Sequence, residues 1–260
     1  MIGIEWAPLA GAFVVAIVGF TGVGGGSLMA PILLFGFGLD LATVAATDLL
    51  FATGTKLASS AMHSKNKLVD WQISKRLWLG SIPATLAVLA LAYFGVAFAN
   101  PEWLMRVIGA LILIIALSLI FGSHIQSLQS EHRLETPEKF KRMQAPVTTL
   151  AWAVLGSLVT LTSIGAGALG AVIFRALYPL RMKPRLVATD TTHAIPVSLL
   201  AGMDYLSIGY VEVELMLMLL LGSLPAALVI SNMLNKLPAH WVKNTLASVL
   251  AVAGIKLLTG

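Results

Sequence analysis

Residues 19–27 read Gly-Phe-Thr-Gly-Val-Gly-Gly-Gly-Ser, and a weaker version, Leu-Thr-Ser-Ile-Gly-Ala-Gly-Ala, recurs at residues 161–168. Each stretch lies inside a long apolar segment, 7–37 or 147–178, where an unbroken membrane helix is expected to continue. Glycine has no side chain and adopts backbone angles that other residues avoid, so it weakens a helix and allows the chain to break. Backbone groups freed inside a bilayer have no water to bind, so a break persists only within protein or beside a wet cavity. The two stretches therefore predict two interrupted membrane helices.

The composition is that of a protein with many membrane spans. Of the 260 residues, 58% are hydrophobic and only 11% are charged, and the mean hydropathy is +0.89. Soluble domains carry about a quarter charged residues, so we expect an all-α polytopic membrane protein in the lipid bilayer. The net charge of +5 suggests a nucleic-acid partner only in a soluble protein. Here the basic residues lie in short loops, where they report orientation instead, and no nucleic-acid partner is expected.

Several classes of site are excluded or not expected. The chain has no cysteine, so disulfides and thiolate metal sites are excluded. We predict neither a metal site nor a cofactor. No basic residues precede the first apolar run, so we expect no cleaved secretory signal.

The apolar segments fall into two halves on either side of a polar stretch. We expect a first repeat at residues 1–122, a cytoplasmic linker at 123–146 and a second repeat at 147–260. Each half is predicted to be a broken or re-entrant helical hairpin followed by three transmembrane helices. The expected hairpins are 7–37 and 147–178, and the expected spans are 41–62, 77–99, 103–122, 186–203, 215–233 and 241–258.

The two halves also match residue by residue. Residues 21–26 align with 162–167 at an offset of 141. Ala46-Thr47-Asp48 aligns with Ala188-Thr189-Asp190 at an offset of 142, and residues 80–84 (GSIPA) align with 222–226 (GSLPA) at the same offset. One single-residue insertion reconciles all three matches, so they indicate an internal duplication.

The charges of the loops indicate that the two repeats are inverted. The loop at 64–76 carries four basic residues, whereas its counterpart at 204–214 is acidic. Conversely, the turn at 181–185 is basic, whereas its counterpart at 36–40 has no basic residue. Because basic loops stay in the cytoplasm, the halves are predicted to have opposite orientations in a bacterial inner membrane. Both termini then lie outside.

An anion site is the function that the breaks favour. A helix that restarts after a break begins with unpaired N–H groups and the positive end of its dipole. Two such starts near the midplane would bind an anion without a charged side chain, and nearby hydroxyls would add donors. The alternative is that the glycines only allow close helix packing, but a duplicated cluster favours the break. A dinucleotide site is disfavoured because no strand precedes the glycines. The candidate substrate-binding residues are Thr21, Gly22, Gly24, Gly25, Gly26, Ser27, Thr162, Ser163, Gly165 and Gly167.

Four ionisable residues inside the predicted spans are candidates for coupling or scaffold roles. Asp48 and Asp190 are repeat mates, and ionisable groups at that depth are costly and often functional. They either carry a proton, cap the broken helices, or pair with Lys56 or Arg175. We favour capping because a carboxylate in the pocket would repel an anion, while the proton role stays open. Lys56 either attracts the anion or extends to the interface, and His193 either titrates near neutral pH or packs as a hydrogen-bonded histidine.

The Gly-Val-Gly-Gly-Gly-Ser cluster (residues 22–27), its weaker second copy, the chain length and the basic first loop together resemble the sulfite exporter TauE/SafE family of membrane permeases. The resemblance covers essentially the whole chain. It implies transport, mainly export, of small sulfur-containing anions such as sulfite or organosulfonates like sulfoacetate. The second copy departs from the pattern, because Ser163, Ala166 and Ala168 replace Gly22, Gly25 and Ser27. An asymmetric pocket is the expected consequence.

Three functional classes remain to be compared. A secondary transporter with alternating access is the leading prediction, and an anion channel would also use broken helices. An intramembrane enzyme is disfavoured, because His193 with Asp190 is the only candidate pair for such chemistry. The oligomeric state stays open, with a homodimer as one alternative.

Overall fold

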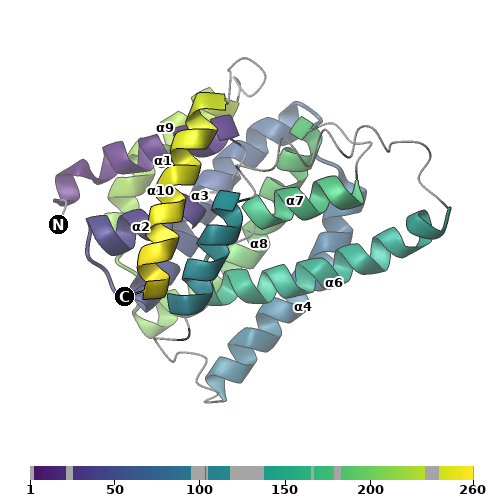
Figure 1. Cartoon of the computed structure of the whole chain (residues 1–260), viewed down its shortest axis with the longest axis horizontal. Helices are drawn as coiled ribbons and strands as arrows, with labels where there is room; N and C mark the ends of the chain where they lie inside the picture. Colours follow the sequence, from purple (N-terminus) through teal and green to yellow (C-terminus); the bar gives the residue numbers. More distant parts are fainter. Residues whose placement is uncertain are drawn as a thin grey trace.

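The computed structural model describes residues 3–21, 26–94, 103, 105–117, 138–164, 167–178, 183–231 and 240–259. Throughout these residues the chain is helical or forms short connections, and they contain no strand. Figure 1 shows the helices as one tightly packed bundle. The elements are η1 (Ile4–Trp6), α1 (Ala7–Thr21), α2 (Gly26–Pro31), η2 (Ile32–Gly36), α3 (Leu41–Lys65), α4 (Trp71–Tyr93), a helical segment at Met105–Leu117, α6 (Glu138–Thr162), α7 (Ala168–Leu177), α8 (Lys183–Ile208), α9 (Val213–Ser231) and α10 (His240–Thr259).

Three of the described helices have the length and apolar composition of membrane spans. Among the described residues, Trp71–Tyr93, Met143–Thr162 and Val213–Ile230 are each long and apolar enough to cross a bilayer. Many large apolar side chains point outward, including Leu79 at 69% exposure and Leu221 at 65%. An outward apolar surface is unfavourable in water and favourable in lipid. The chain is therefore a multi-pass, all-α membrane protein.

Aspartates begin two of the long helices. Asp40 accepts hydrogen bonds from the backbone N–H groups of Ala42 and Thr43 at the start of α3. Asp70 accepts from the N–H of Ile73 at the start of α4. A carboxylate at this position pairs N–H groups that have no partner within the helix. The caps explain why α3 begins at Leu41 and why α4 already begins at Trp71.

The packing partners of the helices form a regular pattern (Figure 1). Helix α1 packs along α9, and α4 packs along α6. Helix α3 contacts both α8 and α9, while α8 contacts both α3 and α4. Exchanging the two halves of the chain interchanges α1–α9 with α4–α6 and α3–α9 with α4–α8, and it leaves the pair α3–α8 unchanged.

Helices α3 and α8 run antiparallel through the middle of this arrangement. The Thr53 hydroxyl donates to Ser198 at 2.9 Å, and the Ser60 hydroxyl lies 2.7 Å from that of Thr192. Gly202 lies against Leu50. As the residue number increases along α3, the number of the contacting residue on α8 decreases, so the two helices are antiparallel.

Two glycines allow the outer helix pairs to approach closely. A Cβ atom on Gly80 of α4 would overlap the carbonyl oxygen of Thr149 on α6. A Cβ atom on Gly222 of α9 would overlap the carbonyl oxygen of Pro8 on α1. Small residues at such crossings are typical of membrane helix interfaces.

The described core contains three apolar clusters, of which the smallest joins Leu49 of α3 to Val197 and Ala201 of α8. The largest includes Leu28 and Met29 of α2, Phe51 of α3 and Leu219 of α9, and it also contains Ile164. The second joins α4, α6 and α7, with Trp152 and Phe174 at its centre, their rings 4.5 Å apart. At the edge of the largest cluster, the segment Met105–Leu117 and α10 meet through Gly109 and Gly254 (Figure 1).

The helix ends differ from the expected spans mainly in the polar stretches. Helix α6 begins at Glu138, inside the polar stretch that precedes residue 147, because its first turns can lie in water. Helix α8 continues through Asp204 to Ile208, so the expected acidic loop at 204–214 is shorter. Its end is set by Gly209, whose φ of 86° favours glycine.

Candidate functional site: two helix breaks and the polar residues beside them

Described helices flank both predicted interruptions. Helix α1 ends at Thr21 and α2 begins at Gly26, while α6 ends at Thr162 and α7 begins at Ala168. Gly22, Gly24 and Gly25 of the first stretch and Gly165 of the second lie outside the described residues. Gly26 and Ser27 form the first turn of α2, and the described part of the first break is its two flanking helices.

The second break is described in more detail, because its N-terminal side is ordered by side-chain bonds. The Thr162 hydroxyl donates to Leu158 O at 2.7 Å and accepts from the N–H of Ile164 at 3.2 Å, which ends α6. Ser163 follows with a φ of 57°, a left-handed conformation that is uncommon for residues other than glycine. On the far side, Gly167 precedes α7 and provides no side-chain cap. The first turn of α7 therefore presents N–H groups without a side-chain partner among the described residues.

Asp48 connects α3 to this second break. Its side chain is fully buried, and Oδ2 accepts a hydrogen bond from the Ser163 hydroxyl. Its other oxygen, Oδ1, has no hydrogen-bond partner within the described part of the chain. Asp48, in the first half of the chain, thus contacts the second break through the Ser163 side chain. Because Ser163 donates its hydroxyl to Asp48, that hydroxyl is not free for a ligand in this arrangement.

Lys56 of α3 is the third charged residue of this region. It sits eight positions after Asp48 on α3, about 12 Å further along the helix axis. It interacts electrostatically with both Asp190 and Asp48. Two carboxylates and one ammonium thus form a chain of alternating charge along the α3–α8 contact.

Asp190 and His193 lie on one face of α8, in contact with α4 and α6. The Ser81 hydroxyl on α4 lies 2.8 Å from His193 Nε2, and the Trp78 indole donates to His193 O at 3.0 Å. The Trp152 indole of α6 hydrogen-bonds the Asp190 carboxylate. His193 Nδ1 lies 3.9 Å from Asp190 Oδ1. Asp190 and His193 are therefore brought together, as their spacing on a helix predicts.

Two threonines beside the aspartates make matching contacts between the halves. The Thr47 hydroxyl accepts from the backbone N–H of Glu212 at 3.1 Å, just before α9. The Thr189 hydroxyl accepts from the backbone N–H of Asp70 at 3.0 Å, just before α4. The two bonds are related by the 142-residue offset at both ends. Each half thus holds the start of a helix of the other half.

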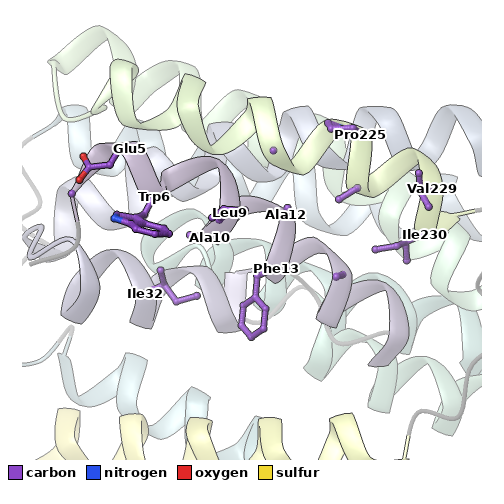
Figure 2. A pocket seen from close by; sticks show the side chains of 14 residues that line it. Glu5, Trp6, Leu9, Ala10, Ala12, Phe13, Ile32, Pro225, Val229 and Ile230 are labelled. Atoms are coloured by element: carbon purple, nitrogen blue, oxygen red, sulfur yellow. The ribbon is translucent and has the colours of Figure 1, made fainter.

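A large groove lies elsewhere, on the outer side of α1 and α9. It has a volume of about 1460 Å³, and Figure 2 shows Trp6, Leu9 and Phe13 lining it with Pro225 and Val229. Its lining is almost entirely apolar, with Glu5 at one end, and it contains none of the candidate site residues. An apolar groove with a carboxylate is unsuited to a small anion, so it is a lipid-facing surface rather than the predicted site.

Several polar residues of the site were not among the predicted ones. Ser81, Trp152, Thr47 and Thr189 each bond a predicted residue or connect the two halves. Ser81 and the two threonines belong to the matching tripeptide and pentapeptide of the two halves, which is a signal that could have selected them. Trp152 has no such signal, because glycine occupies its counterpart position, Gly11, at the 141-residue offset.

Comparisons with known proteins agree on one family. The family model described as "Sulfite exporter TauE/SafE" matches residues 7–257. The chain is 33% identical over 253 residues to the "Probable membrane transporter protein YjnA" of Bacillus subtilis (strain 168), covering 96% of this chain and 98% of that protein. No solved structure gives a significant match.

Proposed function

The chain belongs to the sulfite exporter TauE/SafE family and is a membrane transporter rather than an enzyme; from this premise we propose that it is a secondary transporter of small sulfur-containing anions. The substrates are sulfite or organosulfonates such as sulfoacetate, and the direction is export across a bacterial inner membrane, with both termini outside. The description of the family supports a sulfur oxyanion. The basic loops at 64–76 and 181–185 support the orientation.

The transport mechanism is alternating access of two inverted repeats. The paired bonds of Thr47 to Glu212 and of Thr189 to Asp70 support a two-fold relation between the halves. The antiparallel contact of α3 with α8, which are repeat mates, supports an axis in the membrane plane, because an axis along the membrane normal would make them parallel. In transporters of this design the two halves rock around a fixed central site.

The anion binds at the two helix breaks. The observation that carries this proposal is the second break, where α7 begins at Ala168 without a side-chain cap, a few residues after the left-handed Ser163. Backbone N–H groups and the positive end of the helix dipole favour an anion there. Ile164 shares an apolar cluster with Leu28 and Met29, which follow the first break. That shared cluster supports a single site between both breaks.

Flux into proteoliposomes tests the function. We expect saturable uptake of sulfite and sulfoacetate, accelerated by unlabelled substrate on the opposite side, and slower flux of chloride. Such counterflow is a property of a carrier that binds and reorients. Flux that rises linearly with concentration and shows no counterflow would indicate an anion channel and overturn the proposal.

A further inference from the structure

The hydrogen bonds of Ser81 determine which nitrogen of His193 carries a proton. The Ser81 hydroxyl donates to Leu77 O at 2.9 Å, and its oxygen lies 2.8 Å from His193 Nε2. A hydroxyl has a single hydrogen, and with that hydrogen directed to Leu77 O, Ser81 accepts from Nε2–H. A neutral imidazole has only one N–H, which leaves Nδ1 as an acceptor. A serine nucleophile activated by His193 would have to donate its hydroxyl hydrogen to the histidine. Because Ser81 accepts from His193 instead, this direction of the bond argues against such a nucleophile.

His193 Nδ1 therefore faces another acceptor. Asp190 Oδ1 is 3.9 Å away, the exposed fractions of the two residues are only 3% and 9%, and neither atom has a hydrogen-bond partner among the residues described. An ionised carboxylate accepts but does not donate. Two buried acceptors that face each other without a donor are unfavourable, because both atoms have lost water and gained no hydrogen bond. One proton in this gap resolves the conflict.

The surrounding elements supply few other charges. Helix α3 brings Lys56, which interacts electrostatically with both Asp190 and His193, and beyond it Asp48. The start of α4 brings Asp70, whose carboxylate caps its own helix.

Two further helices approach Asp190 with uncharged groups. Helix α6 brings the Trp152 indole, and α7 brings Gly170, on which a Cβ would lie only 3.3 Å from Asp190 Oδ1. In the described part of the chain, no group of three His, Cys, Asp or Glu side chains is present that could hold a metal ion. A proton fits this gap better than a cation that needs several ligands.

The repeat mate of this pair is built differently. At the 142-residue offset, Phe51 takes the place of His193, and Asp48 takes the place of Asp190. Phenylalanine has no acceptor, and Asp48 instead receives the Ser163 hydroxyl. The need for a proton is therefore specific to the second half.

We propose that Asp190 and His193 form a proton-binding site, in which the Asp190 carboxyl group carries an exchangeable proton that it shares with His193 Nδ1, and that this proton accompanies the transported anion. The coupling rests on the proposed function. Protonation removes one negative charge from the Asp48–Lys56–Asp190 chain, so the Lys56 charge is less compensated and the site attracts an anion more strongly. The proton and the anion enter from the same aqueous phase and leave together to the other, and no other bond is made or broken. Export is therefore driven by the outward gradient of the anion and is opposed by a pH gradient that is acid outside. By reciprocity, anion binding must then favour proton binding.

The proton site itself is tested without any substrate. Infrared difference spectra of the purified protein in lipid, recorded across a pH titration, should contain the C=O band of a protonated carboxylic acid. The band should disappear in Asp190→Asn and remain in Asp48→Asn. In His193→Phe, which reproduces the first half, its titration midpoint should move by about one pH unit or more. A titrating band that persists in Asp190→Asn, or a midpoint unchanged in His193→Phe, would overturn the proton site.

The coupling is tested by comparing two modes of sulfoacetate transport in proteoliposomes. The readout is the ratio of accumulation driven by a pH gradient to counterflow at equal pH, which corrects for differences in protein quality. We expect this ratio to fall at least fivefold in Asp190→Asn and to be retained in Asp204→Asn, near the far end of the same helix. An unchanged ratio in Asp190→Asn, or its loss in Asp204→Asn, would refute the coupling. If no sulfur anion is transported by the wild type, the proposed function fails, whereas the infrared result still decides the proton site.

Discussion

The Thr189 hydroxyl accepts a hydrogen bond of 3.0 Å from the backbone N–H of Asp70, and so ties the middle of the second half to the first turn of α4 in the first half. Its counterpart, between Thr47 and Glu212, does the same for α9. Both threonines directly precede a buried aspartate. The start of α4 is therefore held by the residue next to Asp190, and the start of α9 by the residue next to Asp48.

Removing either threonine hydroxyl should destabilise the protein. Thr189→Val and Thr47→Val each leave a backbone N–H without its partner, and we expect a loss of about 1–2 kcal/mol in the free energy of unfolding. The measurement is denaturant unfolding in detergent micelles. Thr55→Val is the matched control on α3, because its hydroxyl bonds only carbonyls of its own helix. Equal stability of Thr189→Val and Thr55→Val would contradict the role of this contact.

The close helix crossings should not tolerate a methyl group. Gly80→Ala and Gly222→Ala each place a Cβ against a backbone carbonyl of the partner helix, which cannot move aside independently. We expect each variant to lose about 1–3 kcal/mol of stability, measured as a lower thermal midpoint in detergent. Gly54→Ala meets only the flexible end of Leu220 and should cost less. The packing account fails if all three variants melt alike.

The bond between Ser163 and Asp48 should appear as a coupling energy. Ser163→Ala leaves the fully buried Asp48 carboxylate without its donor, so we expect a loss of about 1–3 kcal/mol. In an Asp48→Asn background the same substitution should cost less, since no buried charge is left unpaired. The double-mutant cycle gives the interaction energy directly. Ser157→Ala serves as the control, because it removes a hydroxyl that bonds only its own helix. If the effects of Ser163→Ala and Asp48→Asn are additive, the bond contributes nothing to stability.

The cap at the start of α3 should make stability depend on acid. Partial burial by itself raises the pKa of Asp40, but hydrogen bonds from Thr43 and Ala42 outweigh it and hold the pKa below its usual value. The stabilisation is therefore complete above the unfolded-state pKa of about 3.9 and disappears as the pH falls through the lower folded-state pKa. Asp40→Ala should cost about 1 kcal/mol near neutral pH and less at pH 3. The same difference at both pH values would rule out the carboxylate as the cause.

The sequence predicted the helix break at the second glycine cluster because glycines act locally, and α6 ends at Thr162 next to that cluster. The first break falls on residues 22–25, outside the described residues. It also selected Asp48, Asp190, Lys56 and His193, because ionisable groups within apolar runs stand out without any knowledge of their neighbours. The bond from Ser163 to Asp48 could not be predicted, because it joins residues far apart in the chain.

The sequence likewise could not predict which nitrogen of His193 carries the proton, because this depends on the Ser81 hydroxyl of another helix. Trp152, which bonds Asp190, looks like any apolar core residue until α6 is placed against α8. Helices α4 and α6 begin earlier than the predicted spans, inside the polar stretches, because aspartate caps and water-exposed first turns extend a helix beyond its apolar part.

The affinity of the purified protein for sulfoacetate, with and without bulk at the first break, is the most direct test of the anion site. We expect Gly25→Leu to weaken binding at least tenfold in isothermal titration calorimetry, while Ala90→Leu, at an exposed position of α4, binds as the wild type does. Sulfoacetate binding of unchanged affinity in a folded Gly25→Leu protein would contradict an anion site at the helix breaks.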